Sequence, residues 1–137
     1  RLPKSGKVFI SVKEQDRAKA IEVARDLADL GFALIATRGT GAAIEAAGLK
    51  VTVVNKVAEG RPHIVDMIKN NEVALIINTV EEKRQAIADS RSIRTSALAQ
   101  RVTLYTTIEG ARAACAGLRH LAELETYSLQ ALHAELS

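Results

Sequence analysis

The chain has 137 residues, which is the length of one ordinary domain and too short for two domains with separate cores. Hydrophobic residues make up 47% of it and charged residues 26%, so the composition excludes an intrinsically disordered chain. No apolar run approaches the length of about 18 residues that a membrane-spanning helix needs. A single cysteine excludes an internal disulfide. We therefore expect a globular domain with no membrane partner, in the cytoplasm as the default compartment.

The net charge of +3 comes from 19 basic and 16 acidic side chains that are spread along the chain. Aromatic residues make up only 3%, whereas proteins that bind single-stranded nucleic acid stack bases on aromatic side chains. We expect no nucleic-acid partner. We also expect no metal site, because the single cysteine and three histidines form no zinc-ligand framework. A modest positive charge suits small anions, phosphates in particular.

Short apolar segments alternate with amphipathic segments from end to end. We expect β-strands at residues 7–12, 32–36, 50–54, 74–78 and 102–105. Helices are expected from a cap at Asp16 to a stop at Gly31, and then at 42–47, 62–69, 93–100, 109–118 and 127–136. Residues 79–90 read as a polar loop. Alternating strands and helices predict an α/β fold, with a mainly parallel sheet and helices on both faces.

The first residues read as a cut in a linker, because they contain neither an initiator Met nor the apolar core of a signal peptide. We expect residues 1–6 to be a linker from a preceding domain and residues 7–137 to be the domain itself.

Polar and cationic residues gather where the predicted strands end. Ligands of open parallel sheets bind beyond the carboxyl ends of the strands. Ser11 and Arg17 follow the first strand, Lys56 follows the third, and Asn78 and Thr79 close the fourth. Hydroxyls, an amide and cations with few carboxylates predict a phosphate site. For Lys56 a solvated surface role, and for Asn78 a role in ending the strand, are the alternatives.

The segment TRGTG, residues 37–41, is the strongest candidate for holding a phosphate. Its glycines let the backbone approach an anion, and the free N–H groups at the following helix start point toward it. The hydroxyls of Thr37 and Thr40 add two further donors. The alternative is that a threonine only caps the helix and the glycines only turn the chain. The segment is neither a Walker loop nor a dinucleotide fingerprint.

No combination of residues at the strand ends forms a catalytic set of the Ser/His/Asp, Cys/His or paired-carboxylate kind. His63 follows Pro62 at a predicted helix start, where a structural or exposed role is expected. Cys115 lies among alanines and is expected to be buried rather than nucleophilic. We therefore expect no catalytic residue in this chain.

Several stretches resemble the C-terminal regulatory domain of bacterial carbamoyl-phosphate synthetase large subunits. They are FALIATRGT at 32–40, VNKVAEGRPHI at 54–64, IINT at 76–79, and DSRSIR with SAL between 89 and 98. The resemblance extends over about residues 6–136. It implies the methylglyoxal synthase-like fold, a five-stranded α/β core with a phosphate pocket at the strand ends.

The resemblance further implies a non-catalytic regulatory domain that binds UMP as inhibitor and IMP as activator. Such a domain controls the supply of carbamoyl phosphate for pyrimidine and arginine synthesis. Familiar members carry lysine where this chain has Arg17, and histidine where it has Arg38. The nucleotide or phosphate site would then consist of the following residues: Ser11, Arg17, Thr37, Thr40, Lys56, Asn78 and Thr79.

The resemblance also implies an ornithine site at the border with the rest of the subunit. There, familiar members have Tyr-Asp-Thr and this chain has LYT at 104–106, so only Thr106 carries over. The domain itself needs no cofactor, whereas the full-length enzymes of the family use ATP with Mg or Mn and K. Their partner is a glutaminase small subunit.

Two alternatives remain. One is a methylglyoxal synthase-like enzyme that eliminates phosphate, which needs an aspartate base in a loop after the third strand. The corresponding residue here is Arg61, whose guanidinium has no usable basic form near neutral pH. The other is a free-standing module that binds a phosphate ligand.

Overall fold

A computed structural model describes residues 6–56, 60, 63–80 and 84–136, without the side chains of residues 84–86, 89 and 126–136. Its centre is one sheet of five strands in the order β3-β2-β1-β4-β5. Every neighbouring pair is parallel. The strands are β1 (Lys7–Ser11), β2 (Ala33–Ala36), β3 (Thr52–Val53), β4 (Leu75–Asn78) and β5 (Thr103–Tyr105). The predicted parallel five-stranded sheet is confirmed.

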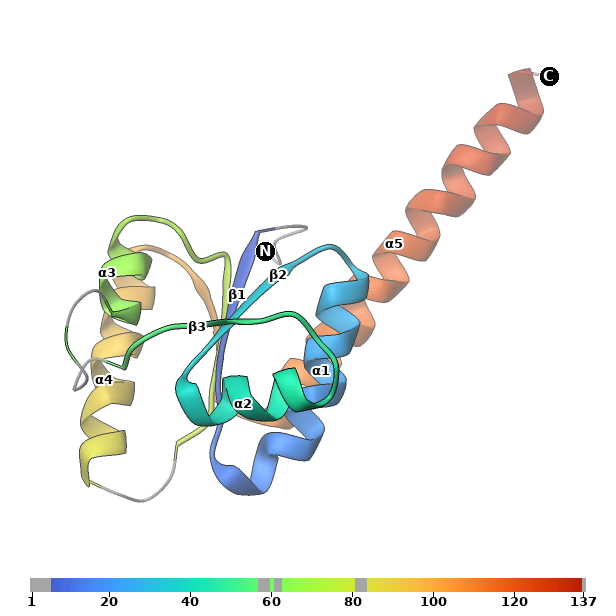
Figure 1. Ribbon diagram of the computed structural model, residues 1–137. Helices are drawn as coiled ribbons and strands as arrows, with labels where there is room; N and C mark the ends of the chain where they lie inside the picture. Colours follow the sequence, from blue (N-terminus) through green and yellow to red (C-terminus); the bar gives the residue numbers. More distant parts are fainter. Residues whose placement is uncertain (1–5, 57–59, 61–62, 81–83, 137) are drawn as a thin grey trace.

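Helices cover both faces of this sheet, as predicted (Figure 1). They are the short 3₁₀ helix η1 (Glu14–Asp16) and the helices α1 (Arg17–Asp29), α2 (Arg38–Ala46), α3 (Ile64–Lys69), α4 (Arg84–Ala99) and α5 (Ile108–Leu136). In the view of Figure 1, α3 and α4 lie to the left of the strands, with α1, α2 and the start of α5 to the right. The far part of α5 projects away from the sheet.

Two apolar clusters explain why the strands need cover on both sides. Val8 and Ile10 of β1 face the cluster shared with α1, α2 and α5, whereas Phe9 between them faces the cluster shared with α3 and α4. All three side chains have no exposed surface. Because side chains alternate along a strand, a continuous apolar run such as β1 is stable only when both faces are buried.

Two helices differ from the prediction because local propensity, rather than an apolar pattern, sustains them. Helix α4 begins at Arg84, inside the segment expected to be a loop, and α5 runs unbroken through residues 119–126, where a break was expected. Neither segment contains glycine or proline, and both are rich in good helix formers. The loop predicted for residues 84–90 is therefore wrong, because a polar segment without glycine or proline can continue a helix.

The predicted helix starts also shift. Asp16 lies at the N-cap of α1, but its backbone is helical and its side chain makes no capping hydrogen bond. Helix α3 begins at Ile64 with His63 as N-cap, two residues later than Pro62, which lies outside the described residues. The expected turn at 37–41 is instead the N-cap and first turn of α2. In the part of the chain that the structure describes, no helix is long and apolar enough to span a bilayer.

Candidate functional site

The strand register brings the predicted polar residues to one edge of the sheet. Ser11 at the end of β1 pairs in register with Asn78 at the end of β4. Ile10 pairs with Ala36, so Thr37 follows β2 beside Ser11. The two side chains touch, because the Thr37 hydroxyl donates a hydrogen bond of 3.0 Å to Ser11 Oγ. Ser11 keeps its own proton for a further acceptor.

Two threonine hydroxyls hold the segment that follows β1. The backbone N–H of Val12 donates to Thr40 Oγ1 at 3.1 Å, and that of Lys13 donates to Thr79 Oγ1 at 2.9 Å. Thr40 also donates to the carbonyl of Val12 at 3.4 Å. The described contacts of Thr40 are therefore structural ones, and its proton is engaged, while the proton of Thr79 remains available.

Asn78 lies on the α4 side of this edge and is 6% exposed. Its side-chain N–H donates to Ser90 Oγ at 3.0 Å. Ser90 was expected within a loop and not as a site residue. Its spacing from Ile93 and Ala97, which share the buried face of α4, is the helical signal that could have placed it.

The first turn of α2 presents N–H groups that no carbonyl of the helix itself accepts. Thr37 is the N-cap in an extended conformation, but its hydroxyl binds Ser11 and makes no capping hydrogen bond. The first intrahelical bond runs from the N–H of Gly41 to the carbonyl of Thr37 at 2.6 Å. The three N–H groups before it, on residues 38–40, have no intrahelical acceptor, and the helix dipole is positive at this end.

Arg17 lies directly against this helix start. A Cβ on Gly39 would come within 2.5 Å of Arg17 Nη2, so only glycine leaves room for the guanidinium in this position. Arg17 Nε is buried and has no hydrogen-bond partner among the described residues. A cation at the positive end of a helix is unfavourable by itself. An anion bound between the guanidinium and the N–H groups of Gly39 and Thr40 would make that interaction favourable.

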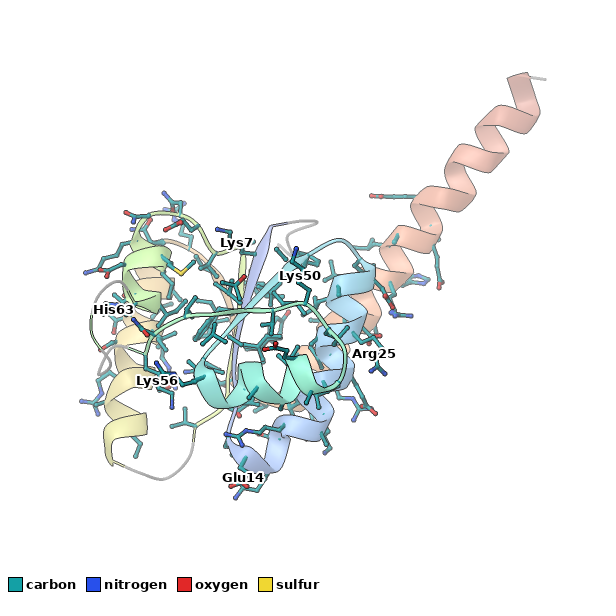
Figure 2. All side chains as sticks on the ribbon, in the orientation of Figure 1. Lys7, Glu14, Arg25, Lys50, Lys56 and His63 are labelled. Atoms are coloured by element: carbon teal, nitrogen blue, oxygen red, sulfur yellow. The ribbon has the colours of Figure 1, made fainter. Side chains whose placement is uncertain are left out.

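Lys56 is an exposed residue two positions after the last β3 contact, in which the N–H of Val54 donates to Ala36. Figure 2 shows Lys56 toward the same end of the molecule as Glu14, and Lys7 and Lys50 toward the opposite end. The strand-end edge thus gathers cations from two separate segments of the chain. Thr106, the one residue carried over to an ornithine site, is exposed just before α5.

The residues expected to be inert are placed accordingly. Cys115 is 2% exposed, and burial, helped by Asp26, raises the pKa of its thiol to about 11. His63 is also buried, with its backbone N–H donating to Asp66 Oδ2 at 3.3 Å. Among the described residues, no group of three His, Cys, Asp or Glu side chains is placed to hold a metal ion. Arg61 lies outside the described residues.

Comparison with models of known protein families assigns the chain to a family. Residues 19–106 match the model of the MGS-like domain family. The chain belongs to this family. The matched residues include Thr37, Lys56 and Asn78. The match begins after Ser11 and Arg17, so these two candidate site residues lie outside it.

The relatives of this MGS-like domain are much longer proteins. It is 65% identical over 136 residues to the carbamoyl phosphate synthase large chain of Ralstonia nicotianae, covering 99% of this chain and 13% of the relative. The large chain of Pseudomonas putida is 56% identical over 135 residues, with 98% and 12% covered. The chain thus spans about one eighth of the length of these relatives.

Among solved structures, methylglyoxal synthase from Elizabethkingia anophelis has a TM-score of 0.64 to this MGS-like domain. The match covers 83% of this chain and 79% of that protein, with 18% sequence identity. At this identity the likeness shows the fold alone. The expected resemblance of the sequence, in family and fold, is confirmed.

Proposed function

We propose that this chain is the nucleotide-binding regulatory domain of a carbamoyl phosphate synthase large chain. It would bind UMP as inhibitor and IMP as activator at the strand-end edge. The observation that carries the proposal is Arg17 at the start of α2, whose Nε is buried and has no hydrogen-bond partner among the described residues. A phosphate dianion supplies the acceptors that Arg17 and the first turn of α2 require.

Three other predicted residues, Ser11, Lys56 and Thr79, fit the same ligand, whereas Thr37, Thr40 and Asn78 already donate hydrogen bonds within the protein. Ser11 and Thr79 each retain a hydroxyl proton, and Lys56 contributes a second cation. Few aromatic residues are available to stack a base, since the chain has only two Phe and two Tyr. Both Phe9 and Phe32 are buried. Affinity would therefore come chiefly from phosphate and ribose, with weak discrimination between a pyrimidine and a purine.

Calorimetric titration of the domain tests this proposal. UMP and IMP should compete for one pocket, uridine should bind much more weakly than UMP, and inorganic phosphate should displace both at high concentration. Inhibition by UMP and activation by IMP would then arise because each base favours a different state of the large chain. Simultaneous saturation by UMP and IMP, or uridine binding as tightly as UMP, contradicts the proposal.

Lys56→Ala gives a second test with a matched control. A charge-assisted hydrogen bond contributes roughly 1–3 kcal/mol, so the affinity for UMP should fall about tenfold or more. Lys50→Ala is the control, because Lys50 is equally an exposed lysine but lies at the opposite end of the molecule (Figure 2). Equal affinities of the two variants would remove Lys56 from the site.

The wider setting belongs to the same proposal. The domain would regulate, in the cytoplasm, a ligase that uses ATP with Mg or Mn and K and makes carbamoyl phosphate for pyrimidine and arginine synthesis. Its partners would be the rest of the large chain and a glutaminase small subunit. Of the residues that form the ornithine site in the family, this chain would contribute only Thr106.

A methylglyoxal synthase-like activity is the competing function, and the fold alone does not support it. The position of the aspartate base carries Arg61. We expect no methylglyoxal from dihydroxyacetone phosphate in a colorimetric assay of the purified domain. Measurable turnover would overturn the regulatory interpretation.

A further inference from the structure

The outer surface of α3 and α4 combines apolar and cationic side chains. We call it the α3–α4 face and define it by Lys69, Arg91, Arg94 and Leu98, all of them exposed. Leu98 alone is 74% exposed, the largest value among the large hydrophobic side chains that the structure describes. A single exposed leucine is ordinary on a protein surface, but this one lies one and two helical turns after Arg94 and Arg91 on α4, the helix that lines one side of a groove.

The groove lies between the two helices and has a volume of about 670 Å³. Val65 and Lys69 line it from α3, while Arg91, Thr95 and Ala99 are among the lining residues of α4. It thus offers carbon-rich walls with positive charge and hydroxyl groups along them. Such a surface suits an extended or helical segment that carries both apolar and acidic side chains.

The cations of this face are available for a partner. Among the ion pairs of the described residues, none involves Lys69, Arg91 or Arg94. On the other side of the sheet, by contrast, Arg112 and Arg119 of α5 pair with carboxylates of α1. The carboxylates of α1 are therefore already paired, and α1 of a second copy offers few of them to the cations of the α3–α4 face.

We propose that the α3–α4 face docks an acidic, partly apolar segment from the remainder of the large chain. This inference rests on one part of the proposed function, that the chain is a domain of such a large chain. The matched relatives devote only 13% and 12% of their length to it, so most of each relative lies outside this domain. A regulatory domain must contact that remainder to influence it, because coupling requires two linked states.

A two-fold contact between two copies fits this face poorly. Such a contact is isologous, with the same patch on both sides. It would place Lys69, Arg91 and Arg94 against the same cationic patch of the second copy, and like charges brought together at an interface repel each other. A segment of opposite charge neutralises them instead and covers Leu98.

Zero-length cross-linking of the full large chain in its complex tests the docking directly. A carbodiimide joins an ammonium to a carboxylate in contact with it. Lys69 should become linked to an Asp or Glu outside this domain but in the same chain, and Lys50 should not. The docking is overturned if Lys69 is linked only to a second copy or to another subunit, or if no linkage of Lys69 forms.

Hydrogen exchange of the same complex supplies a variant-based readout. Leu98→Glu should accelerate amide exchange about tenfold in α4 and, together with it, in one acidic segment elsewhere in the large chain. Leu121→Glu is the matched control, because Leu121 is also exposed but lies on α5. Acceleration confined to α4, or equal effects of the two variants, contradicts the docking.

Nucleotide titration of the same samples separates this inference from the proposed function. Leu98 lies at the end of α4 remote from Ser90 and the strand-end edge, so Leu98→Glu should leave the affinity for UMP within about twofold of wild type. A wild-type complex that shows the Lys69 linkage but binds no UMP disproves the proposed nucleotide site and leaves the docking standing. A complex that binds UMP but shows no Lys69 linkage disproves the docking and leaves the proposed nucleotide site standing.

Discussion

The two sides of the sheet bury similar apolar strands but treat their charged side chains differently. On the α1–α5 side, Arg119 pairs with Asp26 and Asp29, and Lys19 pairs with Glu109, all across the helix interface. On the α3–α4 side, the described contacts between helices are apolar, and the outward cations are left without ion pairs. Exposed ion pairs contribute little stability. The difference therefore concerns surface chemistry, because the described helices pair their charged side chains with each other on one side only, and we propose that a partner covers the cations of the other.

The largest effect should come from the apolar layers, where the two sides are alike. Ile76 and Ile77 are adjacent in β4, almost fully buried, and point to opposite clusters. Each substitution by alanine should lower the free energy of unfolding by about 2–5 kcal/mol, through lost burial and a cavity. Urea denaturation measures both. A loss near zero for Ile76→Ala would mean that the α3–α4 side adds little to the fold without its partner.

The next effect concerns the strand-end edge, to which both sides contribute. Arg17 comes from the α1 side, and Arg17→Ala should weaken UMP binding about tenfold or more, because it removes a charge-assisted contact. Ser90→Ala on the α4 side removes the partner of Asn78, and should instead cost about 1–3 kcal/mol of stability through an unsatisfied buried amide. Calorimetry and urea denaturation distinguish the two. The reverse pattern would transfer the phosphate contact to the α4 side.

Gly39→Ala should affect binding more than folding. The new Cβ would lie within 2.5 Å of Arg17 Nη2, so the guanidinium must move, and we expect a several-fold loss of UMP affinity. Stability should change little, because alanine favours a helix over glycine by about 1 kcal/mol and offsets the displacement. Gly117→Ala is the control on α5, with no atom within 4 Å of the added Cβ, and should be stabilising with unchanged binding. Identical UMP affinity in both variants would refute the close approach.

The smallest effect should come from the surface charges themselves. Arg119→Ala in the isolated domain should lower stability by about 0.2–1 kcal/mol, and this loss should shrink at high salt because the pairs with Asp26 and Asp29 are exposed. Arg94→Ala should lower the stability of the isolated domain by less than Arg119→Ala does, because Arg94 has no ion pair among the described residues. Thermal unfolding at two salt concentrations compares them. A larger loss for Arg94→Ala would show that the α3–α4 side has internal partners after all.

The sequence by itself determined the class of fold and which polar side chains lie together at the candidate site. Five apolar segments separated by amphipathic ones admit few arrangements other than a parallel sheet between helices, because each strand must bury both faces. The polar residues at the ends of those segments, such as Ser11, Thr37 and Asn78, then had to meet at one edge, because parallel strands all end there. Local chemistry also placed Cys115 in the core. The predicted helix boundaries were wrong at residues 84–90, where polar composition indicated a loop, and at residues 119–126, where two helices were expected instead of one.

Only the tertiary structure decided what each of those residues contacts. Thr40 reaches Val12 across 28 residues, Thr79 reaches Lys13 across 66, and Arg119 reaches Asp26 across 93. The approach of Arg17 to Gly39 depends in the same way on how α1 packs beside α2. Periodicity and propensity describe a residue and its near neighbours, whereas these contacts depend on the order of strands in the sheet and the face that each helix covers. That is why the sequence could predict which side chains lie at the strand-end edge, while only the structure showed that the Thr40 hydroxyl binds the backbone of Val12 and that the buried Arg17 Nε has no hydrogen-bond partner among the described residues.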